Sequence, residues 1–196
     1  MKIITGLALL AVLGTASVPL RADGAYVLGG IGGKAVYDQD FDDYYAGSND
    51  PYPSDWTDDY GNVLGEGTVS LGWRFPGVMA VEAMVGVDTA REASATTYLG
   101  DSTLLINPMF TVALGPVFCW DRPSWWFAES GVTELGLRAE WASISGSETV
   151  DGYGSQNFSD SAPGFGIFLR ALNIWNPTGF NIGLEVGYDY EYFDDL

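Results

Sequence analysis

The chain has 196 residues, a formal net charge of −18, one cysteine and no histidine. This length suits one domain. The acidic balance argues against nucleic acid as a partner, because nucleic acid is bound through basic patches. Cys119 alone cannot form a disulfide framework, and the lack of histidine excludes histidine-based triads, general bases and metal ligands.

Residues 1–22 have the character of a secretory signal peptide. Met1 and Lys2 precede an apolar core over 3–13, and small residues follow it. We expect cleavage after Ala22, with Ser17 as the alternative position, and a mature domain over 23–196; a buried N-terminal helix is the other interpretation. Neither this core nor any later apolar run is long enough for a membrane-spanning helix, which leaves secretion, the periplasm or an outer membrane.

The rest of the sequence predicts antiparallel strands. Residues 180–193 (FNIGLEVGYDYEYF) alternate between apolar or aromatic residues and small, polar or charged ones, which is the period of a β-strand. The run suits a tilted strand with lipid on one side and a polar lumen on the other. We expect seven strands in all, near 24–36, 62–75, 79–90, 103–119, 125–143, 163–175 and 180–193.

The connections between these strands alternate in length. Short connections that contain turn residues lie at 76–78, 121–124 and 176–179, and long polar loops lie at 37–61, 91–102 and 144–162. This alternation is typical of outer-membrane barrels. Aromatic residues cluster at the short connections, as in an interfacial belt; aromatics of a soluble core are the alternative, and would lie in mid-strand.

The short turns also predict strand register, because opposed residues share a face of the sheet. The turn at 176–179 sets Arg170 opposite Glu185, and the turn at 76–78 sets Glu66 opposite Asp88. The connection at 121–124 sets Trp120 opposite Trp125 and therefore Thr111 opposite Glu134. In each hairpin, polar faces meet polar faces.

On these features, the chain resembles the small outer-membrane β-barrels, such as the eight-stranded transmembrane domain of outer membrane protein A. The likeness is carried by GAYVLGGIGG (24–33), NVLGEGTVSLGWRF (62–75) and NIGLEVGYDYEYF (181–193), together with the leader and the loop alternation. It implies an all-β, up-and-down transmembrane barrel in the bacterial outer membrane. The family has an even strand count, so the resemblance also implies that an eighth strand is missing after Leu196, and that the seam between 24–36 and 180–193 is open. If the barrel does close within these residues, we expect the eighth strand inside 37–61 or 91–102.

Charged residues recur on the faces that are predicted to point inward. In a barrel whose interior is filled by side chains, such charges must be paired. We therefore expect an ion-pair network that plugs the lumen, formed by Glu66, Arg74, Glu82, Asp88, Glu134, Arg138, Arg170 and Glu185, with Glu140, Asp189 and Glu191 on the same faces. A conducting or catalytic site is the less favoured interpretation.

The first long loop is acidic and aromatic. Asp38, Asp40 and Asp42 share a two-residue spacing that calcium ligands often show, but the glycine and terminal glutamate of a helix–loop–helix calcium site are missing. The alternative is a solvated surface loop. We predict no cofactor, and no role for Cys119.

The function that these features favour is a structural or surface-interaction protein of the outer membrane. Its expected partners are membrane lipid and extracellular ligands that contact 37–61 and 144–162, with no nucleic acid. The alternatives are a narrow channel for small or apolar solutes, a lipid-modifying barrel enzyme, which the lack of histidine makes a poor fit, and a soluble calcium-binding β-sandwich.

Overall fold

Every regular element in the structure, a computed structural model, is a β-strand. The structure describes residues 2–15, 24–38, 63–97, 100–124, 128, 130–175 and 180–193. The strands are β1 (Lys2–Thr15), β2 (Gly24–Asp38), β3 (Val63–Arg74), β4 (Met79–Asp88), β5 (Arg91–Thr97), β6 (Gly100–Ile106), β7 (Phe110–Arg122), β8 (Ser130–Val150), β9 (Gly154–Trp175) and β10 (Phe180–Phe193). No helix in these ranges is long and apolar enough to cross a lipid bilayer.

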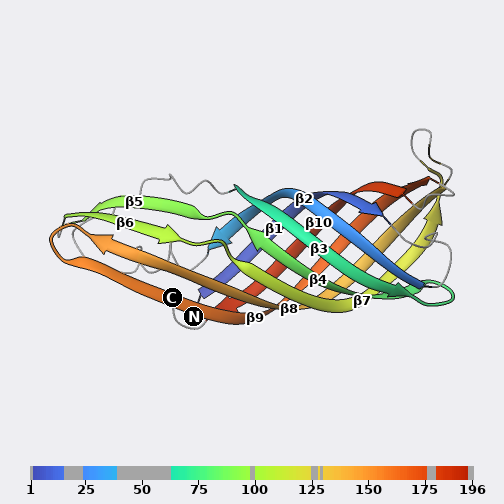
Figure 1. Cartoon of the computed structure of the whole chain (residues 1–196). Helices are drawn as coiled ribbons and strands as arrows, with labels where there is room; N and C mark the ends of the chain where they lie inside the picture. The colour runs from blue at the N-terminus through green and yellow to red at the C-terminus, as the bar shows by residue number, and fades with distance from the viewer. Residues whose placement is uncertain are drawn as a thin grey trace.

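Eight of the strands close into an antiparallel barrel (Figure 1). The order around the wall is β1, β2, β3, β4, β7, β8, β9 and β10, and the pairing of β1 with β10 completes the ring. Closure leaves no unpaired sheet edge around the wall. The predicted fold class, an all-β antiparallel up-and-down barrel, is confirmed.

The eighth strand lies at the N-terminus, in the segment that the sequence marks as a leader. β1 pairs with β10 from Lys2↔Phe193 to Thr15↔Phe180, and with β2 from Ile4↔Asp38 to Thr15↔Val27. The predicted open seam is therefore wrong, and so is the expectation of an eighth strand inside 37–61 or 91–102. Uniformly apolar residues show no period of two, so the sequence pattern of 2–15 did not indicate a strand. Removal of residues 1–22 as a signal peptide stays a prediction.

The outward positions of the wall form an apolar band. β4 alternates strictly between exposed and buried residues along its whole length. Leu71, Val85 and Leu184 are 60%, 55% and 54% exposed. Val69, Val81 and Val186 are exposed as well, and Ile182 is half-buried. Cross-strand pairing continues the band from Val69 to Val85, Val112 and Trp141. The two faces predicted for 180–193 are confirmed, because Leu184 and Val186 face outward and Glu185 faces the lumen.

Two of the three predicted hairpin registers are confirmed. Arg170 lies opposite Glu185, and Glu66 lies opposite Asp88. The third is wrong, because β7 continues to Arg122 and β8 begins only at Ser130. Cys119 instead of Thr111 is therefore the partner of Glu134. The register of β7 against β8 differs from the predicted one by an even number of residues, so the inward-facing residues of both strands still lie opposite each other.

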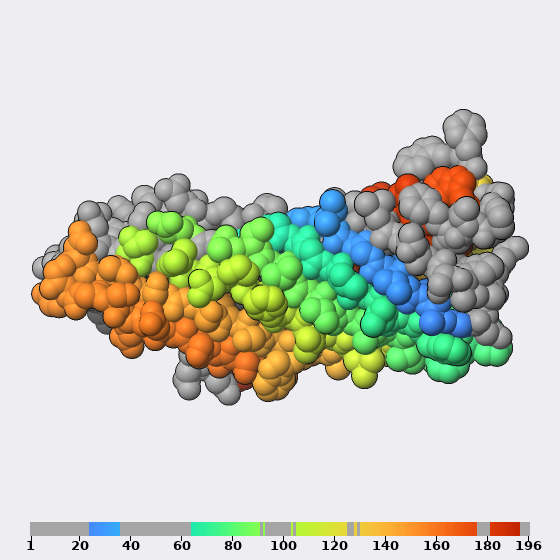
Figure 2. Space-filling view, viewed as in Figure 1, coloured from blue at the N-terminus to red at the C-terminus, as the bar shows by residue number. Residues whose placement is uncertain are grey.

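Two of the predicted loops are strands of a sheet that projects beyond the barrel. β8 and β9 continue as one hairpin to a turn at 151–153, and β5 and β6 form a second hairpin that pairs with β8 from Ser102↔Val150 to Ile106↔Gly146. Figure 2 shows the β8–β9 hairpin, in orange, forming one end of the elongated molecule. The predictions of loops at 91–102 and 144–162 are wrong, since alternating polar residues can form a strand wherever a neighbour offers backbone partners. The predicted strand 103–119 is interrupted at 107–109, next to Pro108, which cannot donate a ladder hydrogen bond.

Candidate functional site: the charged lumen

The barrel interior is filled by side chains arranged in successive levels along its axis. An apolar cluster lies near the short turns and includes Leu28, Val132, Leu172 and Ile174. A second apolar cluster, at the projecting sheet, includes Ile106, Ala142 and Ile144. Between them lie two levels of charge, which we call the turn-side layer and the hairpin-side layer.

The turn-side layer consists of three arginines and three glutamates. Its members are Arg74, Arg138, Arg170, Glu82, Glu134 and Glu185, and all of them are buried. They come from β3, β4, β8, β9 and β10, where each occupies an inward position of the alternation. The sequence predicted all six.

Arg170 is the centre of the turn-side layer. Its Nη1 and Nη2 donate to the two carboxylate oxygens of Glu82 at 2.8 Å each. Its Nε donates to Glu185 at 2.6 Å, and Nη1 also donates to Glu134 at 3.0 Å. A guanidinium presents five donors in a planar fork, which lets one residue connect carboxylates from three strands.

The other two arginines complete the pairing. Arg74 donates to Glu134 at 2.6 Å, and Arg138 donates to Glu185 at 2.7 Å. The Tyr26 hydroxyl donates to Glu82 at 3.0 Å. Each carboxylate of the layer therefore accepts from at least one guanidinium. Buried ions are tolerated when they are paired and hydrogen-bonded in this way.

Phe168 packs against the arginines of the turn-side layer. The guanidinium carbons of Arg138 and Arg170 lie 3.9 Å and 4.6 Å from the centroid of its ring, which is cation–π geometry. The ring lies directly over Gly136, where a Cβ would collide with it. The lack of a side chain at Gly136 therefore leaves room for the Phe168 ring.

The hairpin-side layer has a different composition. Its described side chains are one lysine, Lys34, and five carboxyl groups, which belong to Glu66, Asp88, Glu140, Asp189 and Glu191. The Lys34 ammonium lies 3.9 Å from Asp88, 3.5 Å from Asp189 and 3.6 Å from Glu191. All of these residues are buried except Glu66, which is half-buried.

Lys34 is the functional residue that the sequence reasoning missed. β2 is rich in glycine, which obscures its phase. The sequence holds only two lysines, and Lys34 is an even number of residues after the inward Tyr26 and Leu28. That parity is the signal that could have identified it.

Among the described side chains, the hairpin-side layer has more carboxylate oxygens than hydrogen-bond donors. Both carboxylate oxygens of Glu140 are buried, and neither has a hydrogen-bond partner among the described residues. A Cβ added at Gly166 would lie 2.5 Å from Glu140 Oε1 and 2.5 Å from Asp189 Oδ1, so these two carboxylates approach each other above the glycine. Yet no group of three or more Asp, Glu, Cys or His residues within the described ranges could hold a metal ion.

The sequence also singled out Asp38, Asp40, Asp42 and Cys119. Asp38 is the last residue of β2, and Asp40 and Asp42 lie outside the described residues, so the calcium hypothesis stays a prediction. Cys119 is buried at the turn-side layer, with its sulfur 3.8 Å from Glu134 Oε1.

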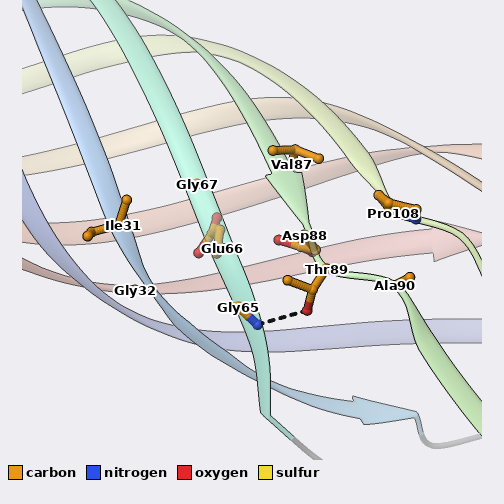
Figure 3. A pocket seen from close by; sticks show the side chains of 10 residues that line it. All are labelled: Ile31, Gly32, Gly65, Glu66, Gly67, Val87, Asp88, Thr89, Ala90 and Pro108. Carbon is orange, nitrogen blue, oxygen red and sulfur yellow. Dashed lines mark hydrogen bonds between the residues drawn. The ribbon is translucent and has the colours of Figure 1, made fainter.

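A hollow of about 800 Å³ lies on the wall where β2, β3 and β4 run together (Figure 3). Gly65 and Gly67 lack side chains there, and Ile31 and Val87 flank them. At one side of the hollow, the Gly65 amide donates to Thr89 Oγ1 at 3.0 Å (Figure 3). Ile31 is 65% exposed, so the hollow belongs to the outward apolar band.

Comparison with known proteins gives only remote structural matches. No family model and no curated protein matches the sequence. Among solved structures, the chain is similar to Ail, the attachment invasion locus protein of Yersinia pestis, with 11% identity and a TM-score of 0.33 in a complex with the heparin analogue sucrose octasulfate. A second structure of Ail gives 10% identity and a TM-score of 0.31. Each match covers 97% of this chain and 98% of the other. At these scores the fold assignment rests on the strand pairing itself.

Proposed function

We propose that this protein is a β-barrel of the bacterial outer membrane, with membrane lipid around the wall and a surface-interaction role for the projecting sheet. The observation that carries the proposal is the closed wall with its outward apolar band. A closed barrel satisfies its backbone hydrogen bonds internally, as a lipid environment requires. Soluble monomers rarely expose contiguous apolar patches larger than roughly a few hundred Å², so a continuous outward apolar band favours lipid as its surroundings.

The membrane assignment is tested by charge on the band. Leu184→Arg, at a position that is 54% exposed, should reduce folding into lipid vesicles, since arginine at a lipid-facing mid-strand position costs about 2–4 kcal/mol. Tyr153→Arg, in the 151–153 turn and 71% exposed, is the control and should fold normally. A Leu184→Arg protein that inserts as well as this control contradicts the assignment.

The surface-interaction role rests on the projecting sheet. Its tip is polar and exposed over most of 147–161, and Tyr153 presents an aromatic ring of the kind that interfaces favour. Glu148, Asp151 and Asp160 give it acidic groups. A net charge of −18 opposes sulfated, polyanionic ligands, so the partner class that we propose is a basic protein surface.

This role is tested by shortening the hairpin in register. Ser145 pairs with Ser159, so deletion of 146–158 and insertion of an Asn-Gly turn preserves the barrel strands. The shortened protein should keep its resistance to urea and lose its binding to immobilised basic proteins at physiological salt. Equal binding by both proteins would refute the role of the sheet and leave the membrane assignment intact.

The proposal includes a lumen that conducts little, and it assigns no catalytic step. Side chains of both charged layers and both apolar clusters occupy the interior, and barrels of this strand number have an interior just wide enough for such filling. Large, steady single-channel currents in planar bilayers would favour the alternative, a narrow channel, in which the carboxylates of the hairpin-side layer would select cations.

A further inference from the structure

The outward apolar band is interrupted by the hollow on β2, β3 and β4 (Figure 3). Gly65 and Gly67 of β3 line it, and Ile31 of β2 and Val87 of β4 lie opposite Gly67 in one cross-strand row. The outward positions of β3 continue with Val69, which is exposed. The volume of about 800 Å³ falls within the range of roughly 300–1,000 Å³ for small-molecule sites. The wall therefore has a concave place of ligand size on its outward face.

Gly67 is not required by the packing of the described residues. A Cβ added there would have Val87 Cγ1 as its nearest neighbour, at 3.9 Å, which is ordinary van der Waals contact. At Gly72 of the same strand, by contrast, a Cβ would collide with the Tyr26 ring. Glycine weakens a strand interior and often marks a place where a ligand approaches the backbone closely. The room above Gly67 is therefore open to a molecule outside the chain.

The shape of the hollow limits what can enter it. Neighbouring strands lie about 4.8 Å apart, so the side chains of Ile31 and Val87 rise about 10 Å apart on the two sides of Gly67. A groove of this width admits one linear hydrocarbon chain. The convex wall of a second barrel would rest on the two side chains without reaching the glycine. The geometry therefore favours a thin, flexible occupant over a second copy of this chain.

The polarity of the hollow changes along its length. The outward residues of β4 are apolar from Met79 to Val87. The next outward residue is Thr89, which is exposed and lines the hollow together with Ala90 and Pro108. The hollow thus extends from the polar boundary of the wall into the apolar band. A lipid in a bilayer has the same order of polarity, because its headgroup lies in the polar region and its acyl chains lie in the hydrocarbon core.

We propose that the hollow is a binding site for one acyl chain of a membrane phospholipid. The inference rests on the proposed membrane location and names one lipid position within it. Ile31 and Val87 contact the two sides of the chain, and the backbone of Gly65 and Gly67 lies beneath it. Lipid tails are as apolar as leucine, so hydrophobic burial does not favour one position on the wall over another. The preference comes from van der Waals contact on three sides of the chain, where a convex wall offers contact on one.

Photo-crosslinking in vesicles locates the lipid. The full chain is refolded into phosphatidylcholine vesicles that contain a phospholipid with a diazirine in one acyl chain, and crosslinked residues are identified by peptide mass spectrometry. Crosslinks should concentrate at Ile31 and 87–90. Crosslinks spread evenly over the exposed residues of the band would overturn the site and leave the membrane location intact. The absence of crosslinks from the whole band would contradict the membrane location as well.

Two substitutions alter the hollow in opposite ways. Gly67→Leu fills it and Ile31→Ala removes one side, so each should abolish the concentration of crosslinks at 87–90. Ala83→Leu adds bulk at an outward position of β4 that does not line the hollow, and it should leave the crosslinks unchanged. All three positions face outward, so the variants should keep their resistance to urea. Crosslinks that stay concentrated at 87–90 in either folded variant, or that Ala83→Leu also disperses, would overturn the proposal.

Native mass spectrometry separates a lipid from a second copy of the chain. Protein released from micelles that contain phosphatidylcholine should retain one phospholipid per monomer. Gly67→Leu should retain none, and Ala83→Leu should retain one. A dimer that Gly67→Leu disrupts would assign the hollow to a second copy and overturn the proposal. Equal lipid retention by Gly67→Leu and the unchanged protein would overturn it too.

Discussion

The two charged layers of the lumen show two ways in which one barrel holds buried charge. In the turn-side layer, three guanidiniums meet three carboxylates, and every carboxylate accepts a bond of 3.0 Å or less. In the hairpin-side layer, one ammonium faces five carboxyl groups, and its three ion-pair distances are 3.5–3.9 Å. Arginine connects several strands through its fork, whereas lysine acts as a point charge. The turn-side layer therefore links strands of the wall through paired charges, whereas the hairpin-side layer holds more carboxyl groups than cations among the described side chains.

The largest expected effect is the loss of the central arginine. Arg170→Met would leave Glu82 without its two guanidinium bonds and would weaken the pairing of Glu134 and Glu185. Orphaning a buried charge costs about 3–5 kcal/mol, so we expect a loss of that order in the free energy of unfolding, measured with urea in micelles. Arg138→Met is the control and should cost less, since Arg170 still donates to both carboxylate partners of Arg138, Glu82 and Glu185. Unchanged urea resistance in Arg170→Met would contradict the pairing.

The next prediction uses two glutamates on the same strand, one in each layer. Glu134→Gln should destabilise the protein by about 1.5–3 kcal/mol, the worth of a hydrogen bond to a charged group. Glu140→Gln should instead stabilise it by about 1 kcal/mol at pH 10, because it removes a buried carboxylate that accepts no hydrogen bond among the described residues. Both residues belong to β8 and both are buried. Losses of equal size at the two positions would abolish the distinction between the layers.

The sequence predicted the turn-side layer better than the hairpin-side layer, for a physical reason. β3, β4, β8 and β10 alternate clearly, and two of the three short turns transmit their phase faithfully, so Arg170 and Glu185 could be paired in advance. Lys34 could not be placed, because the glycines of β2 erase the contrast between its two faces. Arg74 and Glu134 lie on strands that no short turn joins. Whether such side chains meet depends on the diameter of the barrel, so turn register could not predict the pair.

The seam and the projecting sheet were beyond sequence reasoning for related reasons. A uniformly apolar segment such as 2–15 has no phase, and leader peptides and strands share that composition. Polar strands such as the outer part of β9 form because β8 offers a complete row of backbone partners from Glu140 to Val150. Neither feature produces an alternation of apolar and polar residues along the strand, and that alternation was the basis of the strand predictions.

A smaller effect is expected at Phe168, which contacts two arginines of the turn-side layer. Phe168→Leu keeps most of the apolar volume and removes the cation–π contacts, so we expect a loss of about 1–2 kcal/mol. The loss should shrink when Arg138→Met is already present, because one of the two contacts is then absent. A double-mutant cycle of urea unfolding measures this coupling. Strict additivity would mean that the ring serves only as packing volume.

The smallest expected effect tests whether the hairpin-side layer differs from the turn-side layer in its charge alone or also in how rigidly the wall around it is packed. Phe165 and Tyr190 stack across β9 and β10 at the level of that layer, with ring centroids 5.2 Å apart and an interplanar angle of 27°. Phe165 is 54% exposed, on the face of β9 opposite to the inward Gly166. Tyr190→Leu should cost about 0.5–1.5 kcal/mol, as aromatic pairs do. The cost should be the same with and without Glu140→Gln, because the two sites lie on opposite faces of a rigid wall. If Glu140→Gln changes the free-energy cost of Tyr190→Leu, the two faces of the wall are coupled at this level. The two layers would then differ in the packing of the wall as well as in charge.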